Sequence, residues 1–369
     1  MNRHSDVIVV GAGIIGMLTA RELARSGLSV MLIERGQAGR EASRAAAGML
    51  SPLYPWHASA PVAALARWSQ DYYPVLADDL RRASGIDPEW TASGMLCFAP
   101  EEEAEARAWA TAIGTAVDVL SAHAVYRQEP ALAGDARPAI FVPGVAQINI
   151  SKLMRALRET VLNEGIPLRE HMQVNSLLKG EGKILGVRTA TGDFYADHVV
   201  LCCGAWSAEL AAITGTELPV EPVRGQIIQF EGPPGLISRI FCEGHHYLLA
   251  RRAGQILVGS TRENVGFDKG ITTEALSELT HAAWEMLPLL KGAHPQRQWS
   301  GLRPGSPDNI PFIGPCPGVP GLHFNVGHFC NGITQAPASA RLLADMVMER
   351  TPHIDPAPYQ LLREAVDSG

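Results

Sequence analysis

The sequence of 369 residues lacks several features that would place it in a specialised class of protein. Its six cysteines form no C-x-x-C pair and no signal peptide is recognisable, so the disulfide framework of a secreted protein is not expected. No run of Lys and Arg stands out and the formal net charge is -7, which argues against a nucleic-acid partner. Internal repeats and low-complexity tracts are absent too. We therefore expect free thiols in a cytoplasmic protein.

A long hydrophobic run is also missing. The apolar stretch "DVIVVGAGIIGMLTA" at residues 6–20 is too short and too rich in glycine for a membrane span, so no stable membrane insertion is expected. Neither His245 nor His246 has companions at metal-ligand spacing, and we expect no metal site. Hydrophobic residues make up 46% of the chain and charged residues 19%, as in globular proteins. At this length, two interleaved domains are expected instead of one core.

What is present begins with a complete βαβ unit at residues 6–35. Its pattern predicts a strand over 7–10, an amphipathic helix over 14–26 and a second strand over 29–33. The turn between strand and helix carries the spacing G-x-G-x-x-G. Gly11 permits the sharp turn, Gly13 lets the backbone approach a pyrophosphate, and Gly16 lets the helix pack closely on the sheet. The unit therefore predicts a dinucleotide site, with a nucleotide-free βαβ core as the alternative.

Two further features bear on which dinucleotide is bound. Glu34 ends the second strand, where a carboxylate accepts hydrogen bonds from a ribose, and this favours an unphosphorylated adenosine over NADP. The segment "GREASRAAAGMLSP" at 39–52 has small residues that allow close approach to a flat or extended ligand, while Ser43 and Arg44 are placed to reach phosphate. The alternative is a small-residue loop packed against the sheet. On the glycine turn alone, an NAD dehydrogenase stays possible.

The rest of the chain indicates a second layer. The apolar run at 196–206 ends in Gly204 and reads as a buried parallel strand that returns to the nucleotide sheet. Residues 247–262 read as a hairpin around Ala253-Gly254 in a separate antiparallel sheet. Residues 101–114 and 273–290 read as amphipathic helices that cover this sheet. Near the end of the chain, a strand, a turn at Gly327 and a helix from about Thr334 are expected.

Six blocks in a fixed order over nearly the whole chain carry a family resemblance. They are the glycine turn, "EASRAAAGML" (41–50), "HVVLCCGAWS" (198–207), "PVRGQ" (222–226), "GLRPGSPDNIPFIG" (301–314) and "GHFCNGITQAP" (327–337). Together they resemble the D-amino-acid oxidase superfamily of FAD flavoproteins, and within it most of all the glycine oxidase branch linked to thiazole synthesis for thiamine.

The resemblance implies an α/β fold with two parts. A doubly wound, Rossmann-like FAD-binding domain of the glutathione-reductase type is expected over residues 1–85, 146–220 and 300–369. An α+β substrate-binding domain built on an antiparallel sheet is expected over residues 86–145 and 221–299. The cofactor implied is noncovalent FAD, because the cysteine that links flavin in sarcosine oxidases would lie in the block "GLRPG", which has none.

Pattern and resemblance together assign a set of residues to the cofactor. The carboxy-terminal members begin a helix whose positive end favours the anionic reduced flavin. The set is Gly11, Gly13, Ile14, Ile15, Gly16, Glu34, Arg35, Ala42, Ser43, Arg44, Ala46, Ala47, Gly48, Met49, Val174, Gly204, Trp206, His328, Phe329, Cys330, Asn331, Gly332, Ile333 and Thr334.

Arg303 is the main candidate for substrate binding. Its guanidinium can bind a carboxylate with two parallel hydrogen bonds, which fixes both position and orientation. The surrounding Pro and Gly residues suit neither a helix nor a central strand, so a stiff loop is expected around it. By resemblance, Arg303 is the arginine that binds the substrate carboxylate. The alternative is a surface arginine in a turn.

The other substrate-binding candidates are Tyr247, His245, Met49, Cys330 and Arg262. Tyr247 matches the family phenol that supplements the carboxylate contact, and His245 is expected on the same strand face; a merely packed aromatic is the alternative for Tyr247. Cys330 stands where relatives carry a basic residue, while Arg262 stands where an apolar residue is more familiar. One hypothesis is that the positive charge has moved to Arg262, and the other is that Arg262 is a plain surface residue.

The implied reaction is hydride transfer from the α-carbon of an amino acid to flavin N5. It needs alignment and desolvation more than a protein acid or base, so no catalytic residue is assigned. Dioxygen would be reduced to peroxide, and the imine would hydrolyse to glyoxylate or feed thiazole synthesis. A D-amino-acid oxidase, a sarcosine oxidase, a quinone-linked dehydrogenase and the flavin module of a tRNA-modifying protein are the alternatives. A homo-oligomer, either dimer or tetramer, is expected from the resemblance.

Overall fold

The first of two sheets is built around β1 (His4–Val10), whose apolar side chains alternate between the two faces of the sheet. The computed structural model describes residues 4–132 and 134–363. β1 pairs in parallel with β2 (Val30–Ile33) on one side and β9 (Gly192–Leu201) on the other. The sheet continues outward through β6 (Leu168–Arg169), β16 (Leu322–Val326) and β15 (Phe312–Pro315), while β7 (Val174–Gly180) and β8 (Lys183–Thr189) extend it from β9 as an antiparallel meander.

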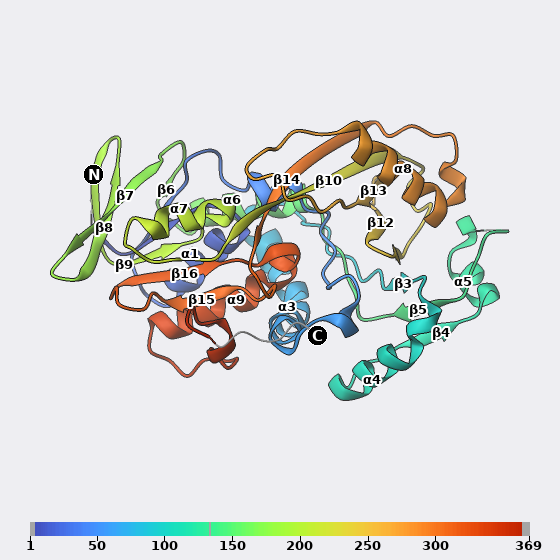
Figure 1. Cartoon of the computed structure of the whole chain (residues 1–369), viewed down its shortest axis with the longest axis horizontal. Coiled ribbons are helices and arrows are strands. Elements are labelled where there is room, and N and C mark those ends of the chain that lie inside the picture. Colours follow the sequence, from blue (N-terminus) through green and yellow to red (C-terminus); the bar gives the residue numbers. More distant parts are fainter. Residues whose placement is uncertain (1–3, 133, 364–369) are drawn as a thin grey trace.

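The two faces of this sheet are covered differently. Val7 and Val9 pack against the helices α1 (Ile14–Arg25), α3 (Ala60–Ser84), α6 (Ile150–Asn163) and α9 (Gly332–Val347). Ile8 and Val10 face the opposite way and pack with the meander and with α7 (Ser207–Ala212). The expected doubly wound arrangement is therefore confirmed, with strands doing much of the covering on the second face (Figure 1).

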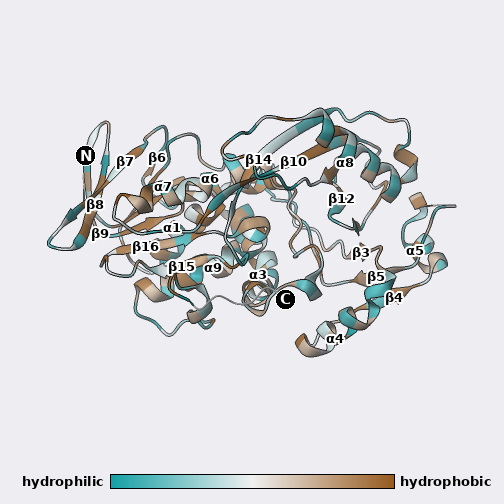
Figure 2. Ribbon diagram, viewed as in Figure 1, coloured by the Kyte–Doolittle hydropathy of each residue, from teal (hydrophilic) through white to brown (hydrophobic). Residues whose placement is uncertain are grey.

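The second sheet lies beside the first and is antiparallel except where β11 and β3 pair in parallel (Figure 1). Its strands, in spatial order, are β14 (Arg297–Gly305), β10 (Glu221–Glu231), β13 (Gln255–Gly259), β12 (His246–Ala250), β11 (Ile240–Glu243), β3 (Met95–Cys97), β5 (Ala139–Val142) and β4 (Asp118–Leu120). The helix α8 (Thr273–Met286) packs on it, and α4 (Glu103–Ile113) and α5 (Ala122–Gln128) lie near its far end. Figure 2 shows mixed hydrophilic and hydrophobic colour on these outer helices.

Most of the expected elements are confirmed. The βαβ unit, the strand that returns at β9, the β12–β13 hairpin and the helices α4 and α8 all lie where the sequence predicts them. The last helix, α9, begins at Gly332, slightly before the expected Thr334. Gly327 takes a φ of 79°, as the predicted turn requires. The six cysteines are free thiols.

Two local expectations are wrong. Arg303 does not lie in a loop: it belongs to β14, where it pairs with Val223 of β10. β14 is the edge strand of its sheet, and an edge strand tolerates Pro304 because one row of its backbone groups needs no partner strand. His245 does not share a strand face with Tyr247; it lies in the tight turn between β11 and β12.

The domain boundaries inferred from the sequence stay a prediction. The strands of the second sheet fall within residues 86–145 and 221–299, except that β14 continues to Gly305. Within the described parts of the chain, we find no helix that combines the length and the apolarity needed to cross a membrane.

An ion-pair cluster joins α1 and α3 to Glu164, the residue that follows α6. Arg21 on α1 is buried, and it donates to both oxygens of Glu164 (2.7 and 2.9 Å) and to Asp79 on α3 (3.0 Å). Burial raises the pKa of Glu164 and Asp79, but the hydrogen bonds and charges of Arg21 and Arg25 outweigh it and hold both pKa values below the ordinary range. Both carboxylates are therefore ionised at neutral pH.

We expect Arg21→Met to lower the free energy of unfolding by about 3 kcal/mol, because it leaves two partly buried carboxylates with only the more exposed Arg25. Urea unfolding at pH 7 measures this. The stabilisation is present above the unfolded carboxylate pKa of about 4 and is lost as pH falls through the lower folded pKa, so the variant should lose less stability on acidification. The exposed Arg81→Met serves as control. Equal stability losses in the two variants would contradict the account.

Candidate active site

A cavity of about 920 Å³ lies where the two sheets meet. The carboxyl ends of β1 and β2 supply Val10 and Ile33 to its wall, and the second sheet supplies Ile227 from β10 and Arg303 from β14. Open α/β sheets bind ligands at the carboxyl ends of their parallel strands. The cavity thus runs from a typical nucleotide position on the first sheet to the edge of the second.

The glycine turn at the nucleotide end has no room for side chains. Gly11 takes a φ of 101°, and a Cβ there would lie 2.4 Å from the carbonyl oxygen of Cys202. A Cβ on Gly16 would lie 1.8 Å from the carbonyl oxygen of Gly11. Gly11 and Gly13 line the cavity together with Ile14 and Ile15, whereas Gly16 lies behind the turn and lets α1 pack against it. The result is a backbone surface open to a phosphate group.

Glu34 braces this turn from the end of β2. Its carboxylate accepts the Ala12 N–H (2.8 Å) through one oxygen and the Gly36 N–H (2.8 Å) through the other, and it lines the cavity. Beside it, the Arg35 guanidinium lies 3.7 Å from the centre of the Trp206 ring, so the two side chains form one wall. Ribose recognition by Glu34 remains a prediction, and its position is compatible with that role.

The small-residue segment after β2 forms the helix α2 (Glu41–Ala45) and a short extended stretch. Ser43 Oγ accepts the Ile14 N–H (3.0 Å) at the start of α1. Arg44 does not line the cavity; its guanidinium donates to Ser151 Oγ instead, so the phosphate contact expected of it is not supported. Consecutive residues of a helix point about 100° apart, which turns Arg44 away when Ser43 faces inward. Ala42, Ala46, Ala47, Gly48 and Met49 do line the cavity.

Two residues that were not predicted from the sequence hold the backbone of this segment by hydrogen bonds. Arg251 is buried, donates to the Ala47 carbonyl and to Gln147 Oε1 (3.1 Å), and has a pKa lowered to about 10 by its burial. Trp299 of β14 donates its indole N–H to the Ala45 carbonyl (3.0 Å). The second domain therefore fixes the backbone that the cofactor would contact. Only the three-dimensional pairing of distant segments reveals these contacts.

The third wall is the start of α9 with the residues before it. His328, Phe329, Cys330, Asn331, Gly332 and Ile333 all line the cavity. Thr334 lies behind them, where its hydroxyl donates to the Met49 carbonyl (3.3 Å). Burial lowers the pKa of His328 to about 3, and its Nε2 contacts Ser339 Oγ at 3.0 Å. His328 is therefore a neutral structural residue. Val174 and Gly204 complete the predicted set along the lining.

Arg303 is held with its guanidinium in the cavity. Nη1 donates to the Thr261 carbonyl (3.0 Å), and Nη2 donates to Ser260 Oγ (2.6 Å). A Cβ added to Gly225 on the neighbouring strand would lie 2.1 Å from Nη1, so the guanidinium occupies the space that a side chain would fill. Among the described residues, no carboxylate forms an ion pair with Arg303. A half-buried cation that is fixed in this way and lacks a counter-ion suits an anionic ligand.

Tyr247 lies beside this arginine. Its hydroxyl is near Gly259, where an added Cβ would approach it to 2.5 Å, and its ring lines the cavity. Burial raises the pKa of Tyr247 to about 12, against the smaller opposing effects of Arg303 and Ser260. The phenol therefore stays protonated and is available as a hydrogen-bond donor. His245 also lines the cavity, from the β11–β12 turn.

Arg262 and Cys330 occupy the same end of the cavity. The Arg262 guanidinium lies 4.6 Å from the centre of the Phe329 ring. Cys330 is solvent-exposed on the cavity wall; desolvation by the surrounding lining raises the pKa of its thiol, and the charges of Arg303 and Arg262 oppose this rise. The structure brings together the six substrate-binding residues expected from the sequence, since Met49 lines the cavity as well.

Comparisons with known proteins identify the family. The model of the family described as FAD dependent oxidoreductase matches residues 6–346. The chain belongs to this family. It is 45% identical over 354 residues to glycine oxidase of Pseudomonas aeruginosa, covering 96% of this chain and 97% of that relative. It is 31% identical over 352 residues to the bifunctional protein ThiO/ThiG of Nostoc sp., covering 94% of this chain and 53% of that longer relative.

A solved structure agrees with these sequence matches. The crystal structure of glycine oxidase from Geobacillus kaustophilus superimposes with a TM-score of 0.92 at 31% identity, covering 98% of this chain and all of the other. The cofactor of the family is FAD, and the cavity suits it: Gly11 and Gly13 would receive the pyrophosphate and Glu34 the ribose. The segment from Ala46 to Met49 and the start of α9 would hold the flavin ring.

The contact between Gly225 and Arg303 generates a test. We expect Gly225→Ala to weaken binding of a small carboxylate such as acetate by about tenfold or more, because the new methyl group displaces the guanidinium that provides a charge-assisted hydrogen bond. The change in flavin absorbance on titration gives the Kd. Gly144→Ala is the matched control, since a Cβ there has its nearest neighbour at 3.9 Å. An unchanged Kd in Gly225→Ala would show that the carboxylate binds elsewhere.

Proposed function

We propose that the chain is a glycine oxidase. It oxidises the C–N bond of glycine, and also of sarcosine and small D-amino acids, to an imine while O2 is reduced to H2O2. The proposal is supported by 45% sequence identity to a glycine oxidase over nearly its whole length. The similarity of the fold to a solved glycine oxidase structure supports it as well. The single observation that carries it is the Arg303 guanidinium, which is fixed in the cavity with no carboxylate partner among the described residues.

The side chains in the cavity suit binding and orientation. Arg303 binds the carboxylate of the amino acid with two hydrogen bonds, and the protonated phenol of Tyr247 donates another. With the acid end fixed, rotation of a small substrate is limited and its α-carbon is held in one position. FAD bound in this cavity would supply the hydride acceptor for that carbon and the route for the electrons to O2. Water then converts the released imine to glyoxylate and ammonia.

No protein acid or base is assigned. His328 is buried and neutral, and Tyr247 keeps its proton up to a pH of about 12. Loss of a proton from the substrate ammonium group to solvent is enough to give the neutral amine that the reaction needs. The role of the protein is therefore alignment and exclusion of water.

We also propose that the imine feeds thiazole synthesis for thiamine. The match to about half the length of a protein named as bifunctional ThiO/ThiG supports this. A homo-oligomer and a cytoplasmic location remain predictions; the molar mass of the purified protein in solution tests the first.

Arg303→Met tests the proposed function. We expect purified wild-type protein to produce peroxide with glycine, and the variant to lose about 100-fold in kcat/KM, chiefly through KM, because a desolvated charge pair with the substrate is removed. The bound flavin should be retained, since Arg303 contacts the second sheet and not the glycine turn. A panel of glycine, sarcosine, D-alanine and large D-amino acids completes the assay. A wild-type preference for large D-amino acids, or no turnover of any of these, would contradict the proposal.

A further inference from the structure

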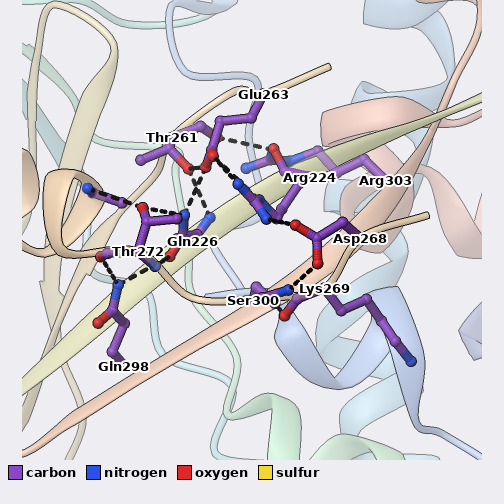
Figure 3. A network of polar contacts seen from close by, with 12 residues as sticks. Arg224, Gln226, Thr261, Glu263, Asp268, Lys269, Thr272, Gln298, Ser300 and Arg303 are labelled. Atoms are coloured by element: carbon purple, nitrogen blue, oxygen red, sulfur yellow. Dashed lines mark hydrogen bonds and ion pairs between the residues drawn. The ribbon is translucent and has the colours of Figure 1, made fainter. Parts of the chain in front are cut away.

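The cationic side chains around the substrate end of the cavity differ in whether a carboxylate neutralises them. Arg224 is buried under the loop that follows β13, and it is neutralised by Glu263 and Asp268, each at 2.5 Å. Lys269 on the same loop pairs with Glu41 at 3.2 Å. In contrast, Arg262 forms no ion pair with any described residue. Arg224 and Lys269 are therefore paired with carboxylates, whereas Arg262 faces the cavity (Figure 3 shows the ion pairs of Arg224).

Arg262 is held in place despite lacking a carboxylate. The residues on both sides of it are tied to β10: Thr261 Oγ1 accepts the Gln226 N–H (2.9 Å), and the Glu263 carboxylate accepts from the Arg224 guanidinium. Thr261 is itself buried. The Arg262 guanidinium is exposed into the cavity and lies over the ring of Phe329. Its backbone is thus fixed while its charged end is open to a ligand.

The cavity lining next to Phe329 carries a small uncharged residue. This residue is Cys330, which lines the cavity beside the Phe329 ring that Arg262 covers. Glu278 of α8 lines the cavity as well, and it is in contact with His246 (3.0 Å) instead of Arg262. Glycine has one acid group, which Arg303 accounts for. Glycine therefore has no acid group left for a second unpaired guanidinium, and the small side chain beside that guanidinium leaves space for a larger substrate.

We propose that Arg262 is a second acid-binding residue, and that the substrates of this enzyme include small amino acids with a second carboxylate. Arg303 binds the α-carboxylate and Arg262 binds the other acid group. This rests on the proposed function and assigns a further substrate class to the same site. The chemistry is unchanged: the α-carbon loses a hydride and the nitrogen a proton, the imine is hydrolysed to the keto diacid and ammonia, and O2 is reduced to H2O2.

The test compares substrates that differ only in the second acid group. We expect wild-type holoenzyme to show a higher kcat/KM for D-aspartate than for D-asparagine. In Arg262→Met, the ratio of kcat/KM for D-aspartate to that for glycine should fall by about tenfold or more, because a charge-assisted hydrogen bond is lost. Arg262→Lys, which keeps the charge without the paired donors, should recover part of the ratio.

Binding without turnover provides an independent measurement. Succinate and its monoamide are titrated into holoenzyme, and the flavin absorbance change gives each Kd. Wild-type protein should bind succinate more tightly than the monoamide, and Arg262→Met should remove this difference. Arg82→Met, an exposed arginine of α3 paired with Asp78, is the control that should keep it.

Three outcomes would overturn the inference. They are equal turnover of D-aspartate and D-asparagine, equal binding of the two succinate ligands, and a loss in Arg262→Met that is the same for glycine as for the diacid. The last would mean that Arg262 serves the α-carboxylate. In each case glycine turnover by the wild type leaves the proposed function intact, whereas no turnover of any amino acid would overturn that function first.

Discussion

The placement of one guanidinium organises the whole site. Arg303 reaches the cavity only because Gly225 on the paired strand has no side chain, and it stays there because Thr261 and Ser260 accept its hydrogen bonds. These partners are neutral, so the charge is oriented without being cancelled. An arginine whose hydrogen-bond partners are all neutral keeps its positive charge available, and it can therefore bind a carboxylate. The rest of the second sheet acts as the support for this arrangement.

The same strand links the substrate end to the cofactor end. β14 carries Arg303 and also packs closely against the small-residue segment. A Cβ on Gly301 would lie 2.4 Å from the Cβ of Ala45, and the Trp299 indole N–H donates to the Ala45 carbonyl. Arg251, directly after β12, donates to the Ala47 carbonyl in the extended stretch that follows α2. Side chains in and next to the second sheet therefore bind the backbone of this segment directly. A small substrate has few groups of its own to fix its orientation, so this rigidity between carboxylate site and flavin site is what alignment needs.

Much of this was predictable from sequence, for identifiable reasons. The βαβ unit could be predicted from local hydrophobic periodicity and from glycines at positions where a side chain would clash with the backbone. The ordered sequence blocks indicated the family. The loop predicted around Arg303 was wrong because pairing of β14 with β10 joins segments some eighty residues apart, which propensity cannot show. The contact of Arg44 with Ser151 could not be predicted, because it depends on how α2 packs on α6. The supporting roles of Ser260 and Arg251 depend on non-local contacts in the same way.

The most direct test is a crystal structure of the FAD-bound protein with glycolate, a carboxylate that resembles glycine and lacks its amine. The account predicts both carboxylate oxygens within hydrogen-bond distance of the Arg303 guanidinium, with the α-carbon facing the flavin ring. A ligand bound away from Arg303, or an arginine turned out of the cavity, would contradict it.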